Sequence, residues 1–179
     1  MRRGLLLDRD GVINVECGYI GGRDRFQWMP GLFPFLQMAQ DRGYRLAVLT
    51  NQSGVARGMY TADDHVTLTK WMRAELGKQG IVIDHVFACY EHPEGADAAY
   101  RRESFWRKPN PGMVLEAIQK MRIDPARSVF LGDQMRDLEA AKAGGVGLRL
   151  LLGDRSPATD DVRQVRNFDE ALQALNPFA

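Results

Sequence analysis

The feature that most constrains this chain is a short apolar run that ends abruptly at two carboxylates. Residues 5–14 read Leu-Leu-Leu-Asp-Arg-Asp-Gly-Val-Ile-Asn, so the apolar stretch stops at Asp8 and Asp10. A short apolar run with such an end is typical of a buried strand. In open α/β sheets, ligands bind in the crevice beyond the carboxyl ends of the strands. The run therefore predicts a buried strand that delivers two acidic side chains to a ligand-binding edge.

The charges of Asp8 and Asp10 suggest a chemistry. Two close carboxylates repel each other unless a cation lies between them or one of them is protonated. Mg²⁺ prefers oxygen ligands and usually arrives with phosphate. One aspartate could then be a nucleophile that forms an acyl phosphate, while the other moves a proton. The alternative is an ordinary turn with a helix-capping aspartate and a surface salt bridge, because Asp and Gly also mark turns.

Strand-like and helix-like patterns alternate along the rest of the chain. Apolar runs predict further strands over residues 44–49, 81–88, 128–132 and 146–152. Between and after them, helical spacing of apolar residues predicts helices that end near Gly43, Gly80, Met121, Gly144 and Leu175. Residues 15–28 lack helical periodicity, which indicates a loop or small flap near the two aspartates. The alternation predicts an α/β fold with a doubly wound parallel sheet in a single domain, residues 1–179.

Composition limits the partners and the compartment. With 179 residues and a net charge of +1, the chain has no global attraction to nucleic acid or to anionic membranes, so any phosphate recognition must be local. The apolar run after Met1-Arg2-Arg3 is too short for a signal peptide or a membrane span, which predicts a cytoplasmic protein. Cys17 and Cys89 are expected to be free thiols. We expect a monomer.

Polar residues follow three of the predicted strands, and a parallel sheet would bring these ends together. Besides Asp8 and Asp10, they are Thr50 and Asn51 after the second strand and Asp133 after the fourth. In a metal-phosphate site, Asp8 would attack phosphorus and Asp10 would protonate the leaving alkoxide and then deprotonate water. Mg²⁺ would be held by Asp8 and Asp133, with the Asp10 carbonyl as a further ligand.

The long segment from Cys89 to Gly112 is too long for a plain connector and contains Arg107 and Lys108 before two prolines. Lys108 would neutralise the charge of the transferred phosphoryl group, to which Thr50 would donate a hydrogen bond. For Thr50 and Asn51, an ordinary strand-end turn is the alternative. Asp137 could bind the metal through water, hold Lys108, or simply lie on the surface of a helix.

These four motifs in this order resemble those of the haloacid dehalogenase superfamily of phosphatases. The match runs over residues 5–150: Asp-x-Asp-Gly at 8–11, Thr-Asn at 50–51, Arg-Lys-Pro at 107–109 and Gly-Asp-x-x-x-Asp at 132–137. The fuller segments 8–14, 50–58 and 107–113 resemble those of the heptose bisphosphate phosphatases within it, and the related histidinol phosphatases share most of them. The resemblance implies no large cap domain, with substrate held by loops.

The resemblance also implies roles for particular residues. It assigns the nucleophile to Asp8, the acid and base to Asp10, and phosphate contacts to Thr50 and Lys108. Substrate recognition falls to Arg107, and Mg²⁺ to Asp8, Asp10 and Asp133. Contacts with the sugar fall on Glu16, Cys17, Gly18 and Tyr19 in the first loop, and on Asn51, Gln52 and Ser53 in the second.

The chain departs from these relatives at two places. Many of them bind a structural zinc in the long loop through Cys-x-His and Cys-x-Cys, where this chain has Cys89 with Glu91 and Ser104 with Trp106. One thiol does not make a four-ligand zinc site, so we expect no structural zinc. Packing of Trp106, Phe105 and Tyr100 is expected to hold the loop instead. The second departure is Gln134, where the heptose phosphatases often have lysine, and it leaves the substrate open.

The sequence is compatible with three functions, two of an enzyme and one of a binding protein. The first is a Mg²⁺-dependent phosphatase for a sugar bisphosphate, the 7-phosphate of a heptose bisphosphate above all. The second is a phosphatase for another monoester, such as histidinol phosphate or a nucleic-acid 3′-phosphate; the near-neutral charge argues against a nucleic-acid partner. The third is a phosphate-binding protein without catalysis, since a fold does not dictate a function. Asp8 and Asp10 together argue against the third.

Overall fold

The first strand lies near the middle of a parallel sheet. The computed structural model describes residues 2–154 and 159–175. Its strands are β1 (Arg3–Leu7), β2 (Tyr44–Asn51), β3 (Ile83–Cys89), β4 (Val129–Gly132), β5 (Leu148–Leu152) and β6 (Arg163–Val165). They pair in parallel in the order β3-β2-β1-β4-β5-β6. The predicted doubly wound parallel sheet is confirmed.

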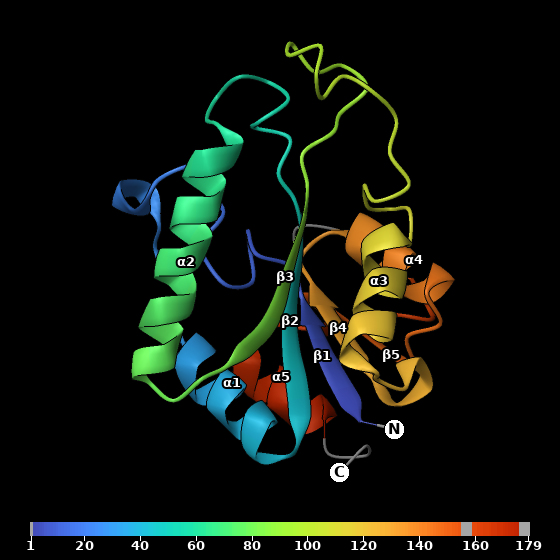
Figure 1. Ribbon diagram of the computed structural model, residues 1–179. Helices are drawn as coiled ribbons and strands as arrows, with labels where there is room; N and C mark the ends of the chain where they lie inside the picture. Colours follow the sequence, from blue (N-terminus) through green and yellow to red (C-terminus); the bar gives the residue numbers. More distant parts are fainter. Residues whose placement is uncertain (1, 155–158, 176–179) are drawn as a thin grey trace.

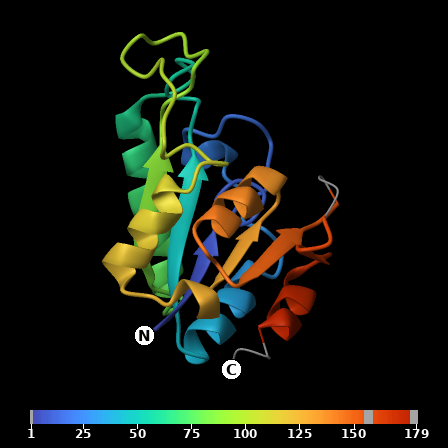
Figure 2. The same ribbon diagram turned by 90° about the vertical axis from the view of Figure 1, so that its right-hand side faces the viewer.

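Helices cover both faces of this sheet. They are α1 (Leu32–Asp41), α2 (Ala62–Lys78), α3 (Gly112–Met121), α4 (Met135–Ala143) and α5 (Phe168–Ala174), with single 3₁₀ turns η1 (Arg23–Arg25) and η2 (Pro125–Arg127). Helices α1, α2 and α5 share one face, and α3 and α4 share the other (Figures 1 and 2). Leu5 and Leu7 of β1 pack in the first core and Leu6 in the second, all fully buried. This is why the first run is apolar throughout.

The strands differ from the predicted runs mostly at their ends. β3 begins at Ile83 rather than at Ile81, and Ile81 is buried outside the strand. No apolar run predicted β6, a strand of three residues at the edge of the sheet whose first two residues are exposed. Only Val165 of its sequence Arg163-Gln164-Val165 is buried, so the strand needs no apolar run. Edge strands are commonly short and polar.

The sheet order creates a crevice at the carboxyl end of β1. The chain leaves β1 with β2 on one side and β4 on the other, so the connections diverge at this point. Two irregular segments lie beyond this edge, residues 15–28 and 90–111, and the second extends furthest above the sheet (Figure 1). In the ranges that the structure describes, these loops stand where a cap domain would be. None of the helices in those ranges is long and apolar enough to cross a membrane.

Candidate active site

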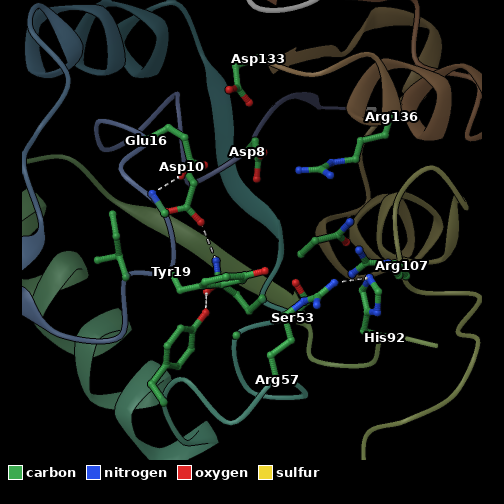
Figure 3. A pocket seen from close by; sticks show the side chains of 16 residues that line it. Asp8, Asp10, Glu16, Tyr19, Ser53, Arg57, His92, Arg107, Asp133 and Arg136 are labelled. Carbon is green, nitrogen blue, oxygen red and sulfur yellow. Dashed lines mark hydrogen bonds between the residues drawn. The ribbon is translucent and has the colours of Figure 1, made fainter. Parts of the chain in front are cut away.

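A cavity of about 450 Å³ lies beyond the carboxyl ends of β1, β2 and β4, which is within the usual size of a small-molecule site. Figure 3 shows it from close by, with acidic side chains on one side and arginines on the other. Ten of the residues singled out from the sequence line it: Asp8, Asp10, Glu16, Gly18, Tyr19, Asn51, Gln52, Ser53, Arg107 and Asp133. The expected convergence of the strand ends therefore occurs.

Asp8 is held firmly at the end of β1. Its backbone amide donates a hydrogen bond to the Leu131 carbonyl of β4 at 3.1 Å, which fixes the residue against the neighbouring strand. The carboxylate atom Oδ1 accepts the backbone amide of Arg9 at 2.7 Å and lies 2.9 Å from Lys108 Nζ. With Oδ1 engaged in these ways, Oδ2 is the atom suited to attack. Asp8 is 6% exposed and lines the cavity.

Lys108 reaches Asp8 from beneath the cavity. Its ammonium nitrogen lies 2.7 Å from Asp137 Oδ1 and donates to the Leu49 carbonyl at 2.7 Å, and the side chain is fully buried. Asn51 pairs with the backbone of Lys108 in both directions, at 3.1 and 3.0 Å, and so ties the long loop to the end of β2. Of the three alternatives for Asp137, the contact with Lys108 is the one that the geometry supports. Asp137 itself is fully buried in α4.

Three buried carboxylates lie close together at this point, and two of them contact Lys108. Asp8, Asp133 and Asp137 each offer a carboxylate oxygen, and these oxygens lie within 4.8 Å of one another. Burial raises the pKa of Asp8 to about 8, with Asp137 adding to the rise and Lys108 opposing it. Burial lowers the pKa of Lys108, but Asp137 and Asp8 outweigh it, so the net shift is upward. A divalent cation at this group would favour the ionised form of Asp8 and offset the repulsion among the three carboxylates, so the group suits such an ion.

Asp10 is surrounded by hydrogen-bond donors. Its Oδ1 accepts from Arg9 Nη2 at 2.9 Å and from Asn14 Nδ2 at 3.0 Å, and its Oδ2 accepts from Gln52 Nε2 at 2.8 Å. The same Gln52 nitrogen donates to Thr50 Oγ1 at 2.8 Å. The Asp10 side chain thus faces away from the three-carboxylate group, so its part in a metal site would come from its backbone carbonyl. These contacts fix the orientation of the Asp10 carboxylate at the wall of the cavity.

Three of the residues singled out from the sequence do not line the cavity. Thr50 and Lys108 lie buried beneath it and reach it through Gln52 and Asp8. Cys17 is exposed, with its sulfur 3.8 Å from the Arg25 carbonyl of the first loop. The second cysteine, Cys89, is buried, and the expectation of two free thiols is confirmed.

The long loop is held partly as expected and partly by other contacts. Trp106 packs against the core and edge-on to Phe87. Tyr100 packs edge-on to Tyr90, with 5.9 Å between the ring centroids. The expectation for Phe105 is wrong, because this side chain is 61% exposed. Its place is taken by polar contacts: the Cys89 thiol lies 3.2 Å from Glu91 Oε2, and Glu91 pairs with Arg102 at 2.9 Å. The absence of a structural zinc stays a prediction.

Gln134, the second departure from the heptose phosphatases, has structural contacts. Its backbone amide donates to Asp137 Oδ2 at 3.1 Å at the start of α4, and its side-chain nitrogen lies 3.4 Å from Asp133 Oδ2. Both contacts involve acidic residues of the site. Gln134 therefore helps to orient the acidic group rather than to supply charge.

Sequence reasoning missed several residues of the cavity. They are Ile20, Gly54, Arg57, Tyr60, His92 and Arg136. Arg57 and Gly54 lie within the segment 50–58 that carries the resemblance, but no role was expected for them. Arg136 lies in the first turn of α4, directly after a strand end that was singled out. A helix that starts beyond the carboxyl end of a strand begins at the same crevice, and this signal could have found Arg136.

Comparisons with known proteins place the chain in a family. Residues 3–145 match the haloacid dehalogenase-like hydrolases. The chain belongs to this family, and the resemblance seen in the sequence is confirmed. The prediction of a hydrolase is confirmed with it.

Individual relatives narrow the comparison. The chain is 46% identical over 145 residues to a D-glycero-β-D-manno-heptose-1,7-bisphosphate 7-phosphatase of Rhodopseudomonas palustris, with 81% of each chain covered. It is 42% identical over 176 residues to a D-glycero-α-D-manno-heptose-1,7-bisphosphate 7-phosphatase of Burkholderia mallei. This alignment covers 97% of this chain and 93% of the relative. Among solved structures, the D,D-heptose 1,7-bisphosphate phosphatase of B. bronchiseptica, in complex with magnesium and phosphate, superimposes with a TM-score of 0.84 at 26% identity and covers 99% of each chain.

Proposed function

We propose that the chain is a Mg²⁺-dependent phosphatase that removes the 7-phosphate of a D-glycero-D-manno-heptose 1,7-bisphosphate. The observation that carries this proposal is the group of Asp8, Lys108 and Asp137 at the edge of a cavity, with Asp133 beside it. The substrate follows from the relatives named for both anomers of this sugar and from the structure that holds magnesium and phosphate. The small cavity suits a small phosphorylated sugar and not a nucleic acid.

In the first half of the reaction, Asp8 Oδ2 attacks phosphorus. The bond between phosphorus and the sugar oxygen breaks, and an aspartyl phosphate forms on Asp8. Asp10 gives a proton to the leaving sugar oxygen, so the product leaves as an alcohol. Lys108 stays 2.9 Å from Asp8 Oδ1 and neutralises part of the charge that collects around phosphorus.

In the second half, water cleaves the aspartyl phosphate. Asp10 takes a proton from the water, which attacks phosphorus while the bond to Asp8 breaks and releases inorganic phosphate. The hydrogen bonds that Asp10 accepts from Arg9, Asn14 and Gln52 hold its carboxylate in position for this step. At the end, Asp8 is again a carboxylate and Asp10 again carries a proton.

The acidic residues fit a magnesium ion. Asp8 and Asp133, with the Asp10 carbonyl, would hold it, and their oxygens are the ligand type that Mg²⁺ prefers. When bound, the ion supplies positive charge that offsets the repulsion between a carboxylate and a phosphate. Asp137 is paired with Lys108 at 2.7 Å, so we assign it to orienting the lysine.

A substrate panel tests the proposal. Phosphate release is measured with both anomers of the heptose bisphosphate, fructose 1,6-bisphosphate and histidinol phosphate, with and without Mg²⁺. We expect the highest kcat/KM with one heptose anomer and no turnover after the metal is removed. Preference for histidinol phosphate would replace the proposed substrate, and full turnover in a chelator would refute the metal requirement.

Two variants test the assigned residues. Asp8→Asn and Asp10→Asn are expected to lower kcat by a factor on the order of 100 to 10,000, the usual contribution of such groups. Asp169→Asn, on an exposed residue of α5, is the matched control and should keep full activity. Full turnover in either active-site variant would refute the catalytic assignment.

A further inference from the structure

The first loop beyond β1 is fixed at two points. At its start, the Val15 amide donates a hydrogen bond to the Gln27 carbonyl at 2.8 Å. Further along, Arg9 Nη2 donates to the Ile20 carbonyl at 3.1 Å, and the Ile20 side chain is buried in the first core. Arg9 is itself only 1% exposed, so this second point is firmly held. Residues 16–19 thus form a short stretch between two fixed points.

This stretch forms part of the wall of the cavity. Glu16, Gly18 and Tyr19 line it, and Figure 3 shows Glu16 and Tyr19 on the side where Asp10 lies. The Tyr19 side chain is among the exposed large hydrophobic ones, although it belongs to this wall. The conformation of residues 16–19 therefore decides what this side of the cavity can contact.

Arg25 holds the stretch from outside the cavity. Its Nη1 donates to the Tyr19 carbonyl at 2.9 Å, and its Nη2 donates to the Cys17 carbonyl at 2.8 Å. The guanidinium thus spans Gly18, which has a φ of +89° and whose added Cβ would lie 4.0 Å from Arg25 Nη2. In the other direction, the Cys17 sulfur lies 3.8 Å from the Arg25 carbonyl. Arg25 itself does not line the cavity.

The hydrogen bonds that leave residues 16–19 all go to Arg25. Within residues 2–154 and 159–175, the remaining hydrogen bond of the stretch is internal, from the Gly18 amide to Glu16 Oε1 at 2.7 Å. A segment with so few contacts opens locally at a small cost in free energy. Without the Arg25 side chain, the stretch would be held only at its two ends.

We propose that Arg25 is a positioning residue that keeps residues 16–19 in the conformation that contacts the sugar part of the substrate. This inference rests on the proposed function and adds to it a residue that sets the affinity for the sugar. Arginine suits this task because its planar fork donates to two acceptors at once. When only a fraction of the protein has a correctly formed binding loop, the apparent affinity falls by that fraction. Loss of Arg25 therefore raises KM, while the chemistry of Asp8 and Asp10 at phosphorus is unchanged.

Steady-state kinetics test this with one substrate that contains a sugar and one that does not. The kcat and KM for heptose 1,7-bisphosphate and for acetyl phosphate are measured for the wild type, Arg25→Ala and Arg25→Lys. We expect Arg25→Ala to raise the KM for the heptose bisphosphate ~3- to 10-fold, as for the loss of one or two hydrogen bonds, with kcat unchanged. Both values for acetyl phosphate should stay the same. Arg25→Lys should show a smaller rise in KM, since it keeps the charge without the fork.

Arg23→Ala is the matched control, because Arg23 is an exposed arginine of the same turn η1 that does not line the cavity. It removes the same charge from the same loop and should leave all four values unchanged. An equal rise in KM with Arg23→Ala would attribute the effect to charge alone. An unchanged KM in Arg25→Ala, or a loss of kcat with both substrates, would show that Arg25 does not act through the sugar. Each of these results overturns the proposal.

Limited proteolysis separates this inference from the proposed function, since it needs no turnover. Chymotrypsin cuts after Tyr19 when the stretch opens, so the rate of this cut, followed by mass spectrometry, reports the population of the open form. We expect Arg25→Ala to raise the rate ~3- to 10-fold and Arg23→Ala to leave it unchanged. If the wild type does not hydrolyse the heptose bisphosphate, the proposed function fails, while this measurement still decides whether Arg25 holds the loop. An unchanged rate of cutting in Arg25→Ala would overturn the proposal.

Discussion

The Asp133 carboxylate lies directly against the α-carbon of Gly11. A Cβ placed on Gly11 would stand 2.2 Å from Asp133 Oδ2 and 2.4 Å from its Cγ. Gly11 also has a φ of +83°, a conformation that residues with a side chain rarely adopt. The turn after β1 therefore approaches the end of β4 closely enough to bring Asp8 and Asp133 to one site, and only glycine allows this approach.

Replacement of Gly11 by alanine is expected to displace Asp133 and to lower kcat by ~100-fold or more, since small misplacements at a reacting centre have effects of this size. Gly58→Ala is a matched control, because Gly58 also has a positive φ, of +71°, and a Cβ added there would meet nothing within 4 Å. Both variants should lose stability through backbone strain, by about 1 kcal/mol, but only Gly11→Ala should lose activity. Steady-state kinetics and urea unfolding of the two variants check this. Equal activities would show that Asp133 can move without consequence.

The buried contact between Lys108 and Asp137 should be strongly coupled. Lys108→Met leaves Asp8 and Asp137 buried without their cation, so we expect a loss of about 3–5 kcal/mol in the free energy of unfolding. Asp137→Asn should also destabilise the fold, and the double variant should lose less than the sum of the two. Chemical denaturation measures all three proteins.

The exposed pair of Lys120 and Glu116, 3.0 Å apart in α3, is the control for this cycle. Lys120→Met should cost no more than about 1 kcal/mol, as is usual for surface pairs. Additive effects of Lys108→Met and Asp137→Asn would mean that the contact between them contributes nothing to stability.

Much of this architecture could be predicted because its causes are local. Leu5, Leu6 and Leu7 are apolar because helices cover both faces of β1, and a run of this kind is visible in any buried parallel strand. The start of α2 also has a local cause: Thr61 precedes the helix, and its Oγ1 accepts the Asp64 backbone amide at 3.0 Å, as a capping threonine does. Asp8 and Asp133 could be expected to lie close together because the carboxyl ends of parallel strands meet at one edge of the sheet.

Other parts depend on contacts that no local pattern encodes. The sequence left three roles open for Asp137, namely binding the metal through water, holding Lys108 or lying on a helix surface, and only the fold shows that it contacts the buried Lys108. Arg57, His92 and Arg136 come from three separate segments, so their common cavity appears only when the loops are in place. Phe105 shows the opposite error: an aromatic residue in a long loop was expected to pack, but the loop holds itself by polar contacts of Glu91 instead.

Tyr60 should act on catalysis through Gln52. Its hydroxyl donates a hydrogen bond to Gln52 Oε1, which directs the Gln52 amide nitrogen towards Asp10 Oδ2 at 2.8 Å. Tyr60→Phe keeps the ring but removes one of the contacts that orient this amide, so we expect kcat to fall by ~10-fold with KM nearly unchanged. Tyr100→Phe, in the long loop, is the control and should keep its kcat. A change in KM alone would indicate that Tyr60 serves substrate binding instead.

Magnesium should stabilise the protein through Asp8 and Asp133. Ligand bound only by the folded chain adds about 2.7 kcal/mol at a concentration 100 times its Kd. We expect this gain in thermal or urea unfolding of the wild type and its loss in Asp133→Asn, while Asp169→Asn should retain it. The gain should shrink at low pH, because protonated carboxylates bind metal poorly. An equal gain in Asp133→Asn would exclude this residue as a ligand.

His65 should make the fold sensitive to acid. The side chain is buried in α2, its Nδ1 lies 2.9 Å from the Tyr90 hydroxyl, and burial, with help from Arg9, lowers its pKa from 6.5 to about 4. Between these two pH values the unfolded chain binds a proton that the folded chain does not. Stability contributed by the neutral imidazole is therefore present above pH 6.5 and is lost as the pH falls towards 4. The loss amounts to about 3 kcal/mol, at ~1.4 kcal/mol for each pH unit.

Urea unfolding at pH 7.5 and at pH 4.5 measures this loss. His65→Gln should be less stable than the wild type at pH 7.5, because it alters a buried contact, but should lose less stability on acidification. Tyr90→Phe removes the hydrogen bond to Nδ1 and keeps the imidazole, so its loss on acidification should resemble that of the wild type. If His65→Gln and the wild type lose the same free energy between the two pH values, His65 is not the group responsible.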